Sequence, residues 1–85
     1  MSYAVSIRQQ ARKELAGVSL PFRTQIAKKL EALADDPRPP GCTMLRGADG
    51  FWRIRSGDYR VIYEIDDSAK SVVVIKIGHR REAYR

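Results

Sequence analysis

Three arginines in the segment 53–60 are the first candidates for chemistry. Gly57-Asp58 separates two strand-like runs and predicts a two-residue hairpin turn, with glycine where the backbone needs a positive φ. In that register Arg55 lies directly opposite Arg60. Because side chains alternate between the two faces of a strand, Arg53, Arg55 and Arg60 share one face.

The other face of this hairpin is apolar and is expected to pack on helices; it consists of Trp52, Ile54, Val61 and Tyr63. Like charges directly opposite each other destabilise a sheet, so folding alone would rarely favour Arg55 against Arg60. The pairing therefore indicates an anionic ligand on the arginine side. A three-residue loop would break the register and place Arg60 on the other face from Arg53.

A second group of candidates follows the last predicted strand: His79, Arg80, Arg81, Tyr84 and Arg85. Arginine binds phosphate in a bidentate manner, and an aromatic ring can stack on a base, which contributes roughly 1–3 kcal/mol. His79 can exchange a proton near neutral pH, as a base or as a hydrogen-bond donor to RNA. A surface or capping role for His79, and a packing role for Tyr84, are the alternatives.

The chemistry that these groups fit is RNA cleavage by the 2′-hydroxyl. That reaction needs a base, cations to stabilise the charge that develops at phosphorus, and an acid for the leaving oxygen. Glu64 and Glu82 form no carboxylate pair, and the sequence has no phosphate-binding glycine loop. Cys42 and His79 are the only cysteine and histidine, so we expect no disulfide, metal or cofactor. An arginine site would act mainly through electrostatics and positioning.

The composition agrees with a polyanionic partner. The chain has 85 residues, which predicts one domain, 1–85, and its formal net charge is +6 with a sequence pI near 9.9. Such a surplus favours nucleic acid, an acidic protein or an anionic membrane, although a well-solvated surface is the alternative. No run reaches the ~18 apolar residues of a membrane span, and no signal peptide is recognised. We therefore expect a cytoplasmic protein without membrane contact.

The elements that must position these groups follow from periodicity. Strands are predicted at 3–7, 51–55, 59–65 and 71–77, and a short helix at 11–16 that Gly17 ends. A longer helix should begin at the N-cap Ser19 and stop before Pro37, with one apolar stripe: Phe22, Ile26, Leu30 and Leu33. Basic residues off this stripe, among them Lys28 and Lys29, are expected on a solvated surface, with a contribution to RNA binding as the alternative.

The last predicted strand contains consecutive β-branched residues at 72–75, which are typical of a central strand buried on both faces. A strand, two helices and a run of strands together predict an α+β fold. Its sheet should be small and rich in antiparallel pairs, with a short N-terminal strand and a three- to four-strand meander, and the helices should pack on one face.

Three segments together resemble the RelE branch of the RelE/ParE toxins: Leu45-Arg46-Gly47, 52–63 and 77–85. The resemblance extends over the whole chain. It implies a toxin of a type II toxin–antitoxin system that cleaves mRNA in the ribosomal A site, without metal, through 2′-hydroxyl attack. The basic and aromatic positions of the family's site fall on Arg53, Arg55, Arg60, Arg80 and Tyr84, which stabilise phosphate, help to transfer protons and stack on the base.

The sequence departs from some RelE proteins, which carry lysine at the positions of Arg53 and Arg55. Arginine is a weak proton carrier, so charge stabilisation is retained there while the base role is open, with His79 as a candidate. Further candidates for RNA binding are Arg46, Arg81 and Arg85.

The resemblance also implies partners. These are a cognate RelB-like antitoxin whose flexible segment wraps the basic face, the ribosome and mRNA, and operator DNA only through the antitoxin complex. Two alternatives share the fold: a ParE-type inhibitor of DNA gyrase without nuclease activity, and an inactive relic that binds only its antitoxin.

Overall fold

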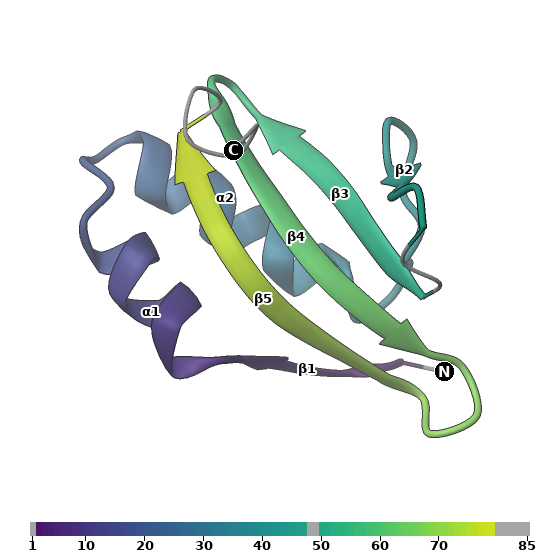
Figure 1. The fold of residues 1–85 in the computed structure, drawn as a ribbon. Helices are drawn as coiled ribbons and strands as arrows, with labels where there is room; N and C mark the ends of the chain where they lie inside the picture. The colour runs from purple at the N-terminus through teal and green to yellow at the C-terminus, as the bar shows by residue number, and fades with distance from the viewer. Residues whose placement is uncertain (1, 48–49, 80–85) are drawn as a thin grey trace.

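One five-stranded sheet organises the chain in the computed structural model, which describes residues 2–47 and 50–79 (Figure 1). The order across the sheet is β1-β5-β4-β3-β2. β1 runs parallel to β5, and all other neighbours are antiparallel. The strands are β1 (Ala4–Ile7), β2 (Thr43–Met44), β3 (Phe51–Ser56), β4 (Tyr59–Asp66) and β5 (Ser71–His79). β2 to β5 thus form a four-strand meander, as the sequence predicted.

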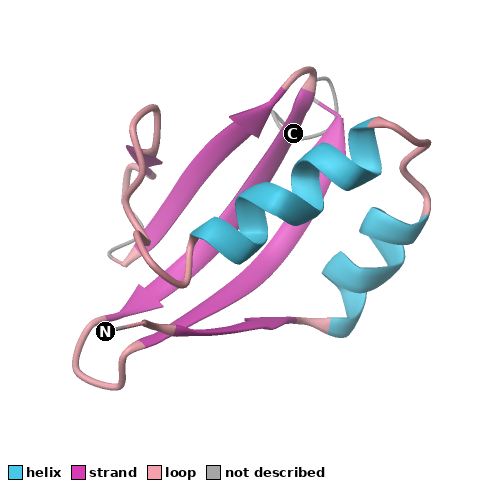
Figure 2. Cartoon of the chain, turned by 180° about the vertical axis from the view of Figure 1, so that it is seen from behind, coloured by secondary structure: helices cyan, strands magenta, loops and turns pink. Residues whose placement is uncertain are grey.

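Both helices, α1 (Gln9–Ala16) and α2 (Phe22–Ala32), pack on the same side of the sheet, as Figure 2 shows. The core lies between the two layers and contains Ala11, Val18, Ile26, Leu30, Leu33, Ile54, Val61, Tyr63, Ile65, Val72, Val74 and Ile77. Burial of this apolar surface is the main force that holds helices against strands. The predicted α+β class and the one-sided helix layer are confirmed.

The predicted apolar stripe of α2 is confirmed at three of its four positions. Ile26, Leu30 and Leu33 are buried in the core. Phe22, by contrast, is 44% exposed. It is the first residue of the helix, so its side chain reaches past the core and its ring contacts that of Tyr59, with centroids 6.1 Å apart.

The two helix starts also differ from prediction. α1 begins at Gln9 rather than at residue 11. The N-cap position of α2 is Pro21, without a side-chain cap, so the expected cap at Ser19 is wrong. Ser19 instead accepts a hydrogen bond from Arg23 N through its backbone carbonyl, at 3.1 Å. Gly17 ends α1 as predicted.

β5 has strand neighbours on both sides, but only its helix side is closed. Val72 and Val74 are fully buried, whereas Val73 and Ile75 are half-buried. Burial on both faces was therefore a wrong prediction, because the helices cover only one face. Ile62 pairs with Lys76 while Tyr63 pairs with Val74, so Ile75 is an extra residue in a β-bulge.

Tyr63, at the centre of β4, connects the sheet to the chain that follows α2. Its side chain is fully buried, and its hydroxyl donates a hydrogen bond to Pro37 O at 2.8 Å. Burial raises the pKa of the Tyr63 phenol above its ordinary value. This contact holds the loop between α2 and β2 beside the strands that carry the arginines.

Candidate nucleic-acid interface

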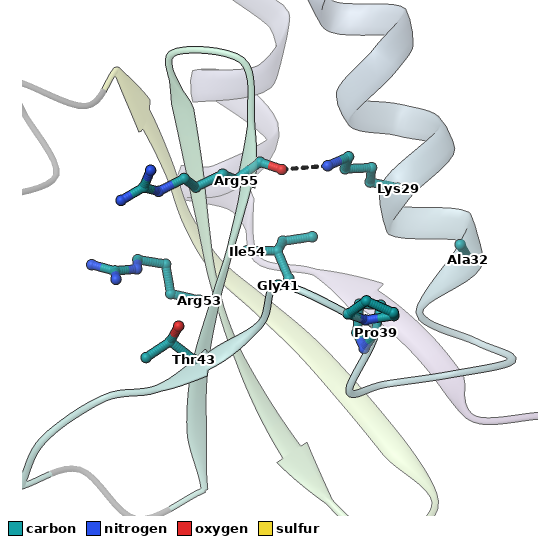
Figure 3. Close-up of a pocket in the computed structure, with 9 residues that line it drawn as sticks. Lys29, Ala32, Pro39, Gly41, Thr43, Arg53, Ile54 and Arg55 are labelled. Atoms are coloured by element: carbon teal, nitrogen blue, oxygen red, sulfur yellow. Dashed lines mark hydrogen bonds between the residues drawn. The ribbon is translucent and has the colours of Figure 1, made fainter.

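The β3–β4 hairpin brings three predicted site residues together. Ser56 pairs with Tyr59 across a two-residue turn, and Gly57 there has φ 60°. Arg55 consequently lies opposite Arg60. Ile54 points toward α2, while Arg53 and Arg55 extend from the other side of the sheet, as Figure 3 shows. We call the side opposite the helices, at Arg53, Arg55 and Arg60, the arginine face.

The arginines differ in exposure. Arg55 is exposed, Arg53 is half-buried, and Arg60 is only 5% exposed. Like charges that pair directly across two strands repel each other, so an anion beside Arg55 and Arg60 would reduce this repulsion. Guanidinium groups match phosphate geometry with two parallel hydrogen bonds. The arginine face can therefore bind a phosphate and stabilise negative charge that develops on it.

A pocket of about 520 Å³ lies around the edge of β3, beside the arginine face. Its walls come from α2, from the segment after α2 and from the β3 edge, and include Lys29, Pro39, Thr43, Arg53 and Arg55 (Figure 3). Lys29 Nζ donates a hydrogen bond to Arg55 O at 2.5 Å. Lys29 is exposed, as expected, and it also connects α2 to the backbone of β3, the strand that carries two of the arginines.

Lys76 is a cation that the sequence interpretation did not single out. It pairs with Ile62, which in turn pairs with Arg53, so the three share the side of the sheet away from the helices. The β-bulge sets which residues of β5 lie on this side. A bulge leaves no reliable signal in a run of apolar residues, so sequence alone could not place Lys76.

His79 lies on the other side of the sheet from the arginine face. It pairs with Tyr59, and their rings meet edge-on with centroids 5.5 Å apart. Gly78, which precedes His79 and pairs with Arg60, lies on the arginine side instead. The structure therefore does not bring His79 together with Arg53 and Arg55, and its role as a base remains a prediction.

The remaining candidates fall into two groups. Arg46 is exposed in the turn that follows β2. Predicted residues outside the described part of the chain are Arg80, Arg81, Tyr84 and Arg85. Among residues 2–47 and 50–79, no three His, Cys, Asp or Glu side chains are grouped as metal ligands. No helix in that part of the chain is long and apolar enough to span a membrane.

A separate charged cluster at the opposite end of the sheet contains Tyr3, Arg38 and Asp67. Arg38 forms two hydrogen bonds to the Asp67 carboxylate, at 2.8 and 3.2 Å, and the Tyr3 hydroxyl donates a third at 2.7 Å. These hydrogen bonds lower the pKa of Asp67 to about 2, and the bond from Arg38 has the largest effect. The guanidinium of Arg38 also lies 5.0 Å from the centre of the Trp52 ring. Arg38 is exposed, but its guanidinium is held by Asp67 and lies over the Trp52 ring.

Comparisons with known proteins agree on one group. Residues 5–84 match the family model described as the ParE toxin of the type II toxin–antitoxin system parDE. Toxin RelG of Mycobacterium tuberculosis is 35% identical over 100% of this chain and 99% of its own length. The mRNA interferase toxin RelE of Escherichia coli is 32% identical, over 98% of this chain and 88% of its own.

Solved structures give the same result. The RelE–RelB complex of Pyrococcus horikoshii matches with a TM-score of 0.84 and 28% identity, over 94% of this chain and 97% of the matched chain. The intact toxin–antitoxin complex RelBE of E. coli matches with a TM-score of 0.79 and 31% identity, over 92% and 96%. The similarity extends over nearly the full length of both partners in each comparison.

Proposed function

The chain belongs to the RelE/ParE superfamily, as a RelE-like toxin of a type II toxin–antitoxin system, and from this we propose that it cleaves mRNA in the ribosomal A site. The observation that carries the proposal is the pairing of Arg55 with Arg60 on a face that also holds Arg53. A relative named as an mRNA interferase supports the same activity.

In the proposed reaction a base removes the 2′ proton, the 2′ oxygen bonds to the adjacent phosphorus, and the bond from phosphorus to the 5′ oxygen breaks as an acid protonates that oxygen. Arg53, Arg55 and Arg60 stabilise the charge that develops on the phosphate, so the reaction needs no metal. Arginine keeps its proton, so the arginine face holds and polarises the phosphate rather than acting as the base. The family positions of Arg80 and Tyr84 add a further phosphate contact and base stacking.

The proposed partners follow from the same membership. Similar solved structures are RelE–RelB complexes, which supports a RelB-like antitoxin for this chain. The formal charge of +6 suits an acidic or amphipathic antitoxin segment. The ribosome and mRNA are the proposed targets, and contact with operator DNA would occur only through the antitoxin.

The test is primer extension on mRNA from a ribosome-programmed translation reaction, with EDTA added only to the naked-RNA control. Naked RNA serves as the control for ribosome dependence. We expect cuts within the A-site codon only when ribosomes are present, and loss of the cuts in Arg55→Ala and Tyr84→Ala. The control variant Lys28→Ala loses an exposed cation of α2 and should cleave mRNA like the wild type. Folded wild-type protein that leaves all mRNA intact would refute the proposal.

A second candidate function is inhibition of DNA gyrase, because the matched family model is described as a ParE toxin. The two functions separate in cells that express the toxin. DNA-damage signalling with intact mRNA would support gyrase inhibition, whereas loss of mRNA without that signal supports the interferase. Tight antitoxin binding with neither effect would identify an inactive relic.

A further inference from the structure

The C-terminal half of β5 loses its strand neighbour on one side. β1 pairs with β5 only from Ser71 to Val74, and Arg8 N then donates to Val74 O at 3.0 Å as the chain turns into α1. Beyond that point β5 continues to His79 with β4 on one side and α1 on the other. Backbone groups on the α1 side therefore need partners that no strand among the described residues supplies.

Glu14 of α1 supplies one of these partners. Its Oε1 accepts a hydrogen bond from Ile77 N at 2.8 Å, in a partly buried position. Its Oε2 lies 3.9 Å from Lys76 Nζ and accepts a weaker bond from Gln10 Nε2 at 3.4 Å. The Glu14 side chain is only 21% exposed. A carboxylate that accepts from a backbone N–H forms a bond about twice as strong as a neutral one.

This contact fixes the end of β5 from the helix side. Ile77 lies one residue before Gly78, which pairs with Arg60 of the arginine face, and three residues before Arg80 in the sequence. Glu14 holds one edge of this stretch of β5, and β4 holds the other. A local loss of the Glu14 bond would let the end of β5 open, since strand ends with few partners open first.

We infer that Glu14 is a positioning residue of the RNA site. It acts through Ile77 N–H to hold the described end of β5 in place, next to Gly78, which pairs with Arg60 of the arginine face. The effect on cleavage rests on the proposed function, whereas the effect of Glu14 on the β5 backbone does not depend on it. In this role Glu14 acts through the backbone of β5, and its other oxygen lies 3.9 Å from Lys76 Nζ.

Two substitutions separate the hydrogen bond from the charge. Glu14→Gln keeps an oxygen that can accept from Ile77 N–H, whereas Glu14→Ala removes it. Glu31→Ala, at an exposed glutamate of α2, is the matched control for loss of a helical carboxylate. NMR-detected amide exchange on the full chain should show Ile77 exchanging roughly 10-fold faster in Glu14→Ala, with Glu14→Gln and Glu31→Ala close to wild type.

Cleavage of ribosome-bound mRNA gives the second measurement. We expect Glu14→Ala to lower kcat roughly 10-fold with little change in KM, and Glu14→Gln to restore most of it, because a small misplacement of catalytic groups lowers the chemical rate. Equal kcat in wild type and Glu14→Ala, or equal losses in Gln and Ala variants, would overturn the inference. A wild-type protein that cleaves nothing would refute the proposed function, and unchanged Ile77 exchange would refute the Glu14 contact independently.

Discussion

Arg55 and Arg60 are direct partners in the β3–β4 register, one exposed and the other almost fully buried. Two guanidinium groups in such a pair cost folding free energy, because like charges opposite each other in a sheet repel. We expect a phosphate bound beside them to offset this repulsion. Removing one charge of the pair should therefore raise the stability of the free protein and lower its affinity for an anion.

Arg55→Gln should therefore stabilise the free protein while it weakens RNA binding. Removing the charge opposite Arg60 should raise the free energy of unfolding by about 0.2–1 kcal/mol. Urea unfolding followed by tryptophan fluorescence of Trp52 measures this change. Arg53→Gln is the control, since Arg53 pairs with the uncharged Ile62. A loss of stability in Arg55→Gln would contradict the repulsion argument.

Salt dependence should show that the arginine face binds phosphate. For single-stranded RNA, log K against log salt has a slope of about −0.7 for each phosphate contacted. Arg55→Gln should make this slope shallower by about 0.7, as measured by fluorescence anisotropy with a short RNA across a salt series. Lys28→Ala, on the helix layer, should keep the wild-type slope. Equal slopes for the Arg55 variant and the wild type would place the RNA elsewhere.

Tyr63→Phe should destabilise the fold without affecting RNA cleavage. The substitution removes the hydroxyl that donates to Pro37 O and leaves that carbonyl in a buried site without its donor. We expect a loss of about 1 kcal/mol in the free energy of unfolding, measured by urea denaturation, with kcat unchanged at temperatures where the variant is folded. A fall in kcat for folded protein would show that the loop after α2 also shapes the site.

Local signals in the sequence predicted the arginine face, whereas contacts between residues far apart in the sequence could not be predicted. The two-residue turn at Gly57-Asp58 sets the β3–β4 register, and Arg55 and Arg60 lie only a few residues from it. Their pairing could therefore be predicted from the sequence. The bond between Glu14 and Ile77 joins residues 63 apart in sequence and depends on how α1 packs. No spacing rule applies at that distance.

The sequence pattern also could not predict on which face of the sheet His79 lies. The bulge at Ile75 shifts the alternation of β5 by one residue, and only then does His79 pair with Tyr59 on the helix side. Apolar residues occupy every position from 72 to 75, so no polar residue marks the shift. A register slip of one residue moves each following side chain to the other face.

The charged cluster of Tyr3, Arg38 and Asp67 gives the fold a defined response to acid. Hydrogen bonds from Arg38 and Tyr3 lower the pKa of Asp67 to about 2, below its value in the unfolded chain, which is about 3.9. A carboxyl whose pKa is lower in the folded state contributes stability above its unfolded pKa, and this contribution is lost as pH falls through its folded pKa. The contribution of Asp67 is thus complete at neutral pH and declines from about pH 4 toward pH 2.

Asp67→Asn should therefore lower Tm at pH 7, and the difference from wild type should shrink as pH falls toward 2. Arg38→Gln should reduce the same pH-dependent difference, because Arg38 is the main cause of the lowered Asp67 pKa. Thermal unfolding by circular dichroism over this pH range measures both, with Asp35→Asn as the control for loss of an exposed carboxylate. A Tm difference between wild type and Asp67→Asn that stays constant from pH 7 to about 2 would show that packing, not the ionised carboxylate, stabilises this end of the sheet.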